Sequence, residues 1–128
     1  MIHSFKKLVD IARQLRGPEG CPWDQSKTLP DLQKDFMEEA EEVKQALEKE
    51  DWENVREELG DILFNIVLMA VIAEEQGRFT MKDVLDGIQE KIVRRHTWVF
   101  GNDKASTPEE AIAIWKKNKA LEKKSFKK

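Results

Sequence analysis

Apolar residues recur every three or four positions along most of the chain, the spacing that places them on one face of a helix. No stretch alternates apolar and polar residues as a half-buried strand would. The pattern therefore predicts an all-α fold, a bundle of about five helices. The five helices are expected over residues 3–16, from Thr28 through Leu47, from Asp51 to about Gln76, from Thr80 to about His96, and from Thr107 through Leu121.

Residues at the expected helix ends support these limits. Thr28, Asp51 and Thr107 can each accept a hydrogen bond from a free backbone N–H group in the first turn of a helix. Gly77 follows the third helix, at the position where glycine commonly ends one. Residues 17–28, GPEGCPWDQSKT, carry Gly and Pro around a tryptophan and are expected to form a loop.

The third predicted helix is apolar around nearly its whole circumference between Ile62 and Ala73. A helix that is apolar on all sides is normally buried, whereas a surface helix shows one apolar stripe. A chain of 128 residues has few other helices with which to surround it. We therefore expect a second copy of the chain to complete a core four-helix bundle, so that the protein is a homodimer.

The composition, 40 % hydrophobic and 37 % charged, fits a helical domain. The net charge of −3 gives no general reason to bind nucleic acid or an anionic membrane. No apolar run approaches the roughly 20 residues that cross a bilayer, and the N-terminus is too polar for a signal peptide. The single cysteine, Cys21, suits a reducing compartment. We expect a cytoplasmic protein with one domain over residues 1–122 and a flexible basic tail over residues 123–128.

Carboxylates are concentrated in the second and third predicted helices. Glu39 and Glu42 are three residues apart and therefore share one helix face, and Glu58 and Asp61 have the same spacing. If the two helices pack as an antiparallel hairpin, these four carboxylates converge at the edge of the core.

A cluster of partly buried carboxylates is unfavourable unless protons, basic side chains or divalent cations neutralise it. Oxygen ligands favour Mg²⁺, Mn²⁺ or Ca²⁺. Neither His3 nor His96 follows a Glu at the three-residue spacing of di-iron bundles. The spacing alone also fits a solvated acidic face, which is the commoner arrangement because Glu-x-x-Glu occurs on many helix surfaces.

Lys91, Arg94 and Arg95 form one basic face on the fourth predicted helix. Opposite a carboxylate–metal cluster, such a face could bind the phosphates of a nucleotide. Taken alone, the commoner role of such a face is to complement the helix dipole and the acidic helices. Each of the four tryptophans could be a core residue, or one could stack on a nucleobase.

Four motifs, in this order, resemble the MazG-type nucleoside triphosphate pyrophosphohydrolases: GCPWD at 20–24, EEAEEV at 38–43, EELGDIL at 57–63 and KIVRRHTWVFG at 91–101. With Trp115-Lys116 they cover about residues 5–119. The resemblance implies an all-α enzyme, usually dimeric, that hydrolyses an NTP or dNTP to the monophosphate and pyrophosphate. It further implies Mg²⁺ as cofactor, with Mn²⁺ possible, and a role in cleaning the nucleotide pool.

Carried over position by position, the resemblance implies a role for each candidate residue. The metal ligands fall on Glu39, Glu42, Glu58 and Asp61, the phosphate contacts on Lys91, Arg94 and Arg95, and the base contact on Trp115. Glu38 matches the first acid of its motif, and as a mechanistic hypothesis Glu38 or Glu39 could accept the proton of the attacking water. The chain departs from the family at Thr97-Trp98, where Pro-His is common, so any role for that histidine is absent here.

Two other functions fit the same residues. One is a non-catalytic helical module for dimerisation or nucleotide sensing, against which the intact set of acids argues. The other is a related all-α pyrophosphohydrolase acting on dUTP or phosphoribosyl-ATP, which competition among nucleotides would distinguish.

Overall fold

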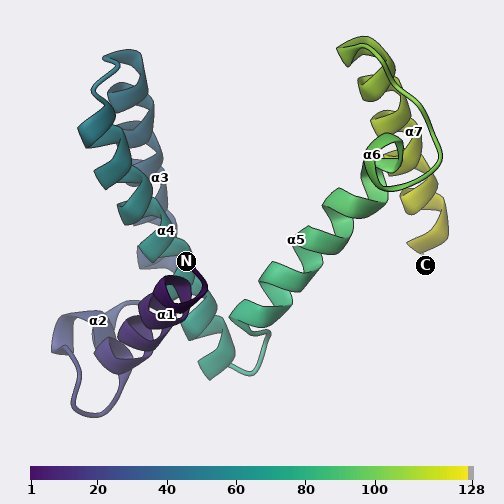
Figure 1. The fold of residues 1–128 in the computed structure, drawn as a ribbon. Helices are drawn as coiled ribbons and strands as arrows, with labels where there is room; N and C mark the ends of the chain where they lie inside the picture. The colour runs from purple at the N-terminus through teal and green to yellow at the C-terminus, as the bar shows by residue number, and fades with distance from the viewer. Residues whose placement is uncertain (127–128) are drawn as a thin grey trace. The chain divides into compact units, whose positions relative to one another are not determined.

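The structure is a computed structural model that describes residues 1–126, and over these residues the chain is helical with no strand (Figure 1). The all-α prediction is therefore confirmed. The helices are α1 (Ile2–Arg16), α2 (Pro22–Ser26), α3 (Leu29–Glu48), α4 (Trp52–Glu75), α5 (Met81–Arg95), α6 (Thr97–Phe100) and α7 (Pro108–Phe126). None of these helices combines the length and apolar character that a membrane span requires.

The five long helices lie where the apolar spacing predicts them, and their ends have the expected caps. The Thr28 hydroxyl accepts a hydrogen bond from the Asp31 N–H at 3.3 Å, and the Asp31 carboxylate accepts one from the Thr28 N–H at 2.9 Å. This reciprocal pair satisfies two backbone groups at the start of α3. Gly77 follows α4 with a φ of 70°, in the left-handed region that favours glycine.

Two short helices, α2 and α6, were not predicted. Each is at most five residues long, and so neither can display a helical repeat of apolar residues. Helix α2 lies within the segment predicted as a loop and has Pro22 in its first turn. Its structure therefore depends on contacts with the rest of the fold, because so short a helix is unstable alone.

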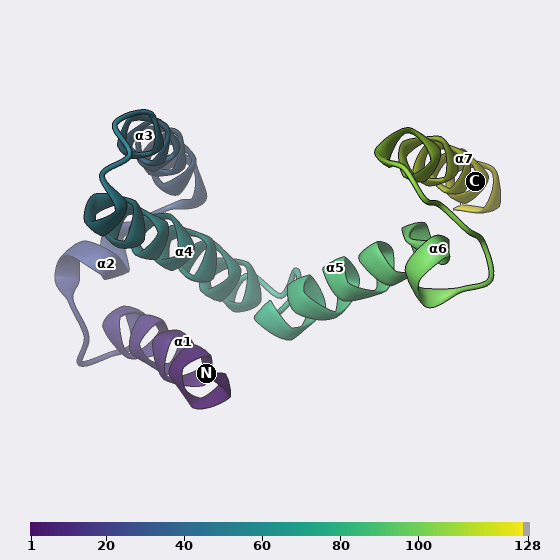
Figure 2. The same cartoon turned by 45° about the horizontal axis from the view of Figure 1, so that its top comes forward.

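Residues Met1–Met81 form a first compact unit, which we call the N-terminal unit. Helices α3 and α4 lie side by side as an antiparallel hairpin, and α1 packs against α4 on a different side (Figure 2). The buried apolar side chains of these three helices are Val9, Ala12, Leu32, Ala46, Val55, Val67, Leu68, Ala70, Val71, Ile72 and Ala73. Most of the buried residues of α4 lie in its C-terminal half, where α1 supplies cover that α3 alone does not.

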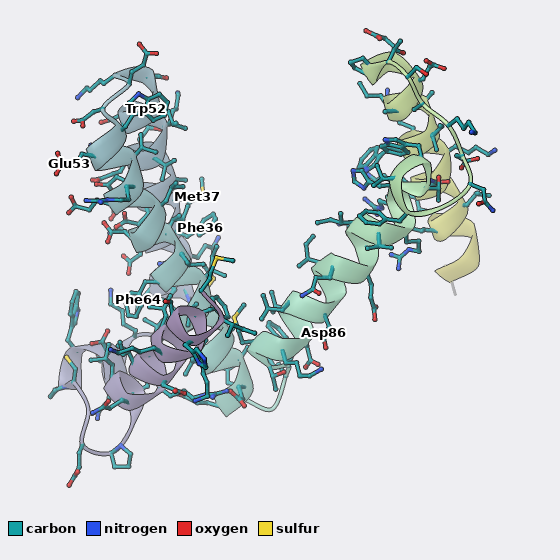
Figure 3. All side chains as sticks on the ribbon, in the orientation of Figure 1. Phe36, Met37, Trp52, Glu53, Phe64 and Asp86 are labelled. Carbon is teal, nitrogen blue, oxygen red and sulfur yellow. The ribbon has the colours of Figure 1, made fainter. Side chains whose placement is uncertain are left out.

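The N-terminal half of α4 and the facing part of α3 keep apolar side chains on the surface. Met37 is 64 % exposed, Leu59 50 % and Leu63 39 %. Figure 3 labels Phe36 and Met37 on α3 and Trp52 near the turn of the hairpin. This surface, together with the 46 % exposed Leu47, is called the hairpin apolar face below. A homodimer that would cover it stays a prediction.

A second compact unit, called the C-terminal unit, begins at Lys82 and includes most of α5 together with α6 and α7. Helix α6 packs on α7. The Asn118 amide of α7 donates to the Arg95 carbonyl at 3.0 Å and to the Thr97 hydroxyl at 2.9 Å, which ties α7 to the junction of α5 and α6. Helix α7 continues through Phe126, so most of the tail predicted for residues 123–128 is helical, and residues 127–128 lie outside the described part.

Candidate active site

Three carboxylates converge across the α3–α4 hairpin. Glu39 of α3 and Glu58 and Asp61 of α4 each place one oxygen within 4.8 Å of the others. The convergence follows from the sequence, because the three-residue spacing of Glu58 and Asp61 puts both on one face of α4 and the antiparallel packing turns Glu39 toward them. We call Glu39, Glu58 and Asp61 the acidic cluster.

Glu42, the fourth predicted metal ligand, lies outside the acidic cluster, but its charge raises the pKa of Glu58. Its side chain lies on α3 one turn after Glu39 and is exposed. It is near enough to Glu58 for its charge to be the largest influence on the Glu58 pKa after burial. The structure thus brings three of the four predicted ligands together and places the fourth beside them.

The acidic cluster is electrostatically unfavourable without a counter-charge. Glu58 is only 7 % exposed. Burial, followed by the charges of Glu42, Asp61 and Glu39, raises the pKa of Glu58 to about 7. Burial is also the main cause that raises the pKa of Glu39, with the charge of Asp61 next. The two carboxyl groups therefore hold protons more tightly than carboxylates in water do.

One carboxyl oxygen of Glu39 and one of Glu58, Oε2 in each, are buried and have no partner among the described residues. Buried polar atoms normally have partners, and a cation would supply one to both oxygens. An all-oxygen donor set of three or four carboxylates fits a hard divalent cation such as Mg²⁺, Mn²⁺ or Ca²⁺, so the residues present are compatible with the predicted Mg²⁺.

A cavity of about 330 Å³ opens beside the acidic cluster. Its walls come from the α2 region, from α3 and from α4. The lining residues are Trp23, Asp24, Lys27, Leu32, Asp35, Glu38, Glu39, Asp61, Phe64, Asn65 and Leu68. Phe64 is labelled in Figure 3. The cavity therefore joins a carboxylate-rich part, which includes the predicted proton acceptors Glu38 and Glu39, to an apolar part formed by Leu32, Phe64 and Leu68.

The α2 side of the cavity contains residues of the GCPWD motif, to which no role was assigned from the sequence. The Lys27 ammonium lies 2.7 Å from an Asp35 carboxylate oxygen and 4.7 Å from the centre of the Trp23 ring. Trp23 itself is 68 % exposed, so its ring is available to a ligand in the cavity. The GCPWD motif marked these residues in the sequence. The spacing of apolar residues could not show that a loop after the first helix would reach α3 and α4.

Asn65 adds a buried acceptor to the cavity. It lies one turn after Asp61 on α4 and is 5 % exposed. Its Oδ1 atom is buried and accepts no hydrogen bond from the described residues. Such an atom can accept from an N–H or O–H group of a ligand, or from an ordered water.

The predicted phosphate and base contacts lie in the C-terminal unit. Arg94 and Arg95 both bind the carboxylate of Glu122, at 3.1 Å and 3.0 Å. Hydrogen bonds from Arg95 and then from Arg94 lower the pKa of Glu122 to about 2. The Arg95 guanidinium also lies 5.4 Å from the centre of the Trp115 ring. The structure thus brings Arg94, Arg95 and Trp115 together, whereas Lys91 is an exposed residue one turn earlier on α5.

Glu122 is a residue of this region that the sequence analysis did not single out. It is the one acidic residue in the lysine-rich segment 116–128. That isolation was a usable signal, since a lone carboxylate among cations is well placed to bind arginines. The acidic set belongs to the N-terminal unit and the basic set to the C-terminal unit, and their meeting at one substrate stays a prediction.

Known proteins resemble this chain over most of its length. A family described as the MazG nucleotide pyrophosphohydrolase domain matches residues 27–100. The uncharacterised protein YabN of Bacillus subtilis is 42 % identical over 123 residues, covering 96 % of this chain and 25 % of that protein. The nucleoside triphosphate pyrophosphohydrolase of Escherichia coli K12 is 38 % identical over 123 residues, covering 95 % of this chain and 47 % of that protein.

Two proteins of Thermotoga maritima are also similar. Its nucleoside triphosphate pyrophosphohydrolase/pyrophosphatase MazG is 40 % identical over 119 residues, covering 93 % of this chain and 45 % of that protein. The crystal structure of a mazG-related protein superimposes with a TM-score of 0.75 at 34 % identity, covering 90 % of this chain and 98 % of that chain. The chain spans half or less of the length of these curated relatives.

Proposed function

Because the chain belongs to the MazG nucleotide pyrophosphohydrolase family, we propose that it hydrolyses nucleoside triphosphates to the monophosphate and pyrophosphate with Mg²⁺. The observation that carries the proposal is the acidic cluster, in which two buried carboxylate oxygens lack partners beside a cavity of about 330 Å³. Two of the similar proteins are named nucleoside triphosphate pyrophosphohydrolases, which supports the same reaction. The chain corresponds to only part of those proteins, so their names support the reaction but do not establish it for this chain.

Glu39, Glu42, Glu58 and Asp61 would hold Mg²⁺, or Mn²⁺ in its place. A divalent ion bound there supplies Lewis acidity, which neutralises charge on phosphate oxygens and makes water a better nucleophile at neutral pH. The carboxylates contribute by fixing the ion at the hairpin, next to the cavity that would receive the nucleotide. Their proximity, unfavourable in the free protein, becomes favourable once a cation lies between them.

Glu38 and Glu39 are the candidates to accept the proton of the attacking water. Both line the cavity. Glu38 is exposed and is not among the proposed metal ligands, so it stays free to accept a proton when the ion is bound, whereas Glu39 would have to serve the ion and the water together. Attack at the α-phosphorus would release pyrophosphate, and the accepted proton would pass to solvent.

Lys91, Arg94 and Arg95 would stabilise the charge on the departing pyrophosphate, with Trp115 against the base. In support of this, both arginines already direct N–H groups at the two oxygens of one anion, the Glu122 carboxylate. A phosphate group presents oxygens of similar spacing to the same donors.

We further propose that the chain forms a homodimer through the hairpin apolar face. Met37, Leu59 and Leu63 lie close to the acidic cluster in sequence and are substantially exposed in one copy. A large apolar surface is characteristic of an interface, because water exposure of these side chains is unfavourable. Covering it would also exclude water from the neighbouring carboxylates, which would strengthen their binding of a cation.

The direct test is to measure pyrophosphate and nucleoside monophosphate from each common ribo- and deoxyribonucleoside triphosphate, with and without Mg²⁺. We expect release of both products only with a divalent ion, and the relative rates would give the preferred base and sugar. Release of orthophosphate in place of pyrophosphate would contradict the proposed reaction. Nucleotide binding without turnover would indicate a sensing module.

A further inference from the structure

Arg16, at the end of α1, makes an unusual number of hydrogen bonds to one short stretch of chain. Its Nη1 group donates to the backbone carbonyls of Asp24 at 2.7 Å, Lys27 at 2.8 Å and Gln25 at 3.3 Å. Its Nε and Nη2 groups donate to the two oxygens of Glu75 at 3.0 Å and 2.7 Å. Only 11 % of the Arg16 side chain is exposed, so these bonds are largely shielded from water.

The three carbonyls belong to the last residues of α2 and the residue that follows it. The final carbonyls of any helix have no partner within the helix. Arg16 supplies one donor group for all three, and Glu75 of α4 holds the guanidinium in place through a fork of two hydrogen bonds. Residues 21–28, which include α2, are called the α2 segment; Arg16 thus fastens its C-terminal end to α4.

The other end of the α2 segment is fixed by the backbone. The Cys21 N–H donates to the Leu15 carbonyl at 2.8 Å. A Cβ atom added to Gly20 would lie 2.1 Å from that same carbonyl oxygen, so the chain passes too close to α1 for any other residue. The position of the rest of the segment depends on the contacts of its second half, and release of those contacts would leave Cys21 joined to α1 by this one described backbone hydrogen bond.

That second half forms one wall of the cavity next to the acidic cluster. Trp23, Asp24 and Lys27 line the cavity, and Arg16 bonds to the carbonyls of two of these three residues. A displaced segment would move the Trp23 ring and would withdraw the Lys27 ammonium from Asp35. The shape and charge of the cavity therefore depend on a side chain that does not itself line it.

We infer that Arg16 is a positioning residue: with Glu75, it holds the α2 segment against the cavity so that substrate meets a preformed wall. Its consequence for catalysis rests on the function proposed above. Lysine cannot replace arginine here, because a single ammonium group cannot fork onto Glu75 and reach three carbonyls at once.

Arg13 provides a matched control. It lies on the same helix one turn earlier and pairs with Glu74, the neighbour of Glu75, at 3.1 Å. Both partners of this pair are more than a third exposed. In the described contacts Arg13 makes no hydrogen bond to the α2 segment. Arg13→Lys therefore alters a neighbouring, more exposed ion pair, whereas Arg16→Lys alters a shielded pair and also removes the carbonyl contacts.

The first measurement is the rate at which a thiol reagent modifies Cys21 in the folded chain. Cys21 is the only cysteine and begins the α2 segment, so the signal reports this segment alone. We expect Arg16→Lys to raise the rate about tenfold through easier local opening, and Arg13→Lys to change it less than about twofold. Equal rates in Arg16→Lys and the wild type would overturn the inference.

The second measurement is steady-state turnover of a nucleoside triphosphate. We expect Arg16→Lys to raise KM and lower kcat/KM by about tenfold, while the Arg13→Lys variant matches the wild type. Part of the binding free energy of the nucleotide would be spent on ordering the displaced α2 segment. If Cys21 reacts faster in Arg16→Lys but kcat/KM is unchanged, the segment is held by Arg16 without serving the reaction, and the inference fails.

Glu75→Gln replaces Arg16→Lys if the latter does not fold by far-UV circular dichroism. This variant weakens the hold on the guanidinium while keeping its carbonyl contacts. An unchanged Cys21 rate in Glu75→Gln would count against the inference.

A wild type that releases no pyrophosphate would refute the proposed function. The Cys21 rates together with nucleotide Kd values would then test Arg16. A wild-type Kd in Arg16→Lys would refute a positioning role.

Discussion

Glu58 is the residue on which the acidic cluster depends most, because it is buried and has a carboxylate on each side. Glu58→Gln keeps the shape of the side chain and removes its charge. We expect pyrophosphate release to fall by about two orders of magnitude or more, since a neutral amide cannot replace a carboxylate ligand of Mg²⁺. Far-UV circular dichroism should stay helical, because the buried core of α4 is untouched.

The same variant separates metal binding from catalysis. A ligand that binds only the folded state raises its stability, by about 2.7 kcal/mol at a concentration 100 times Kd. Millimolar Mg²⁺ should therefore raise the melting temperature of the wild type and have little effect on Glu58→Gln. In Mg²⁺-free buffer the variant should be at least as stable as the wild type, because one of several like charges has been removed. A Mg²⁺ shift of equal size in both proteins would contradict this assignment.

Asn65 illustrates a conflict between stability and binding. Its Oδ1 atom is buried without a partner, which costs about 1–3 kcal/mol relative to a satisfied group. We expect Asn65→Leu to leave the free energy of unfolding unchanged or to raise it by about 1 kcal/mol. The same change should raise KM for the nucleotide, because a polar residue that lines the cavity is lost. Urea unfolding and steady-state kinetics together check this, and a destabilised variant with normal KM would show that Asn65 is a packing residue.

The acids of the site were predictable from the sequence because helical spacing determines which residues share a face. The partners of those acids were less accessible. Burial of Glu58 and the orphan oxygen of Asn65 depend on how closely two helices approach, which spacing does not encode. The contacts of Arg16 were also missed, since they join residues that no periodic pattern relates.

At the scale of helices, the long elements were predictable and the short ones were not. Helices α1, α3, α4, α5 and α7 each contain several turns of apolar repeat, with caps such as Thr28 that appear as single letters in the sequence. Helix α2 is stabilised largely by Arg16 and by the backbone of α1 and its following loop, which are tertiary contacts. Local sequence can therefore limit where such a helix begins but cannot establish that it forms.

The tie between α5 and α7 has a pH dependence that follows from Glu122. The pKa of its carboxyl group is about 2 in the folded protein, against an ordinary value of 4.5, because of the hydrogen bonds from Arg95 and Arg94. A lowered folded pKa stabilises the protein above the ordinary value, and that contribution is lost as pH falls from about 4.5 to about 2. Glu122→Gln should therefore melt at a lower temperature than the wild type at pH 7.

The difference in melting temperature between Glu122→Gln and the wild type should shrink as pH falls through that range. Thermal melts at several pH values check this. Glu109→Gln, at the exposed start of α7, is a control in which the carboxylate lies far along the helix from Glu122. A difference between Glu122→Gln and the wild type that stays constant down to pH 2 would mean that the arginines do not set the stability contribution of Glu122.

At the scale of the whole molecule, one copy of the chain does not cover all the apolar side chains of α4. The C-terminal half of α4 is buried by α1 and α3, but Leu59 and Leu63 remain 50 % and 39 % exposed near the acidic cluster. Each fully buried leucine contributes roughly 1.5–3 kcal/mol by leaving water. A second copy of the hairpin apolar face is the simplest cover, because a two-fold axis presents the same surface to itself.

Leu59→Glu tests this directly. A charge placed in an apolar interface is desolvated without a partner, so the variant should shift from dimer to monomer when its mass is measured by light scattering during gel filtration. Ile11→Glu, at a 42 % exposed position on α1, should leave the mass unchanged. A wild type that is already a monomer at micromolar concentration would contradict the proposed dimer. If Leu59→Glu becomes monomeric and also loses Mg²⁺-dependent turnover while its helix content is kept, the dimer contributes to the site as well as to stability.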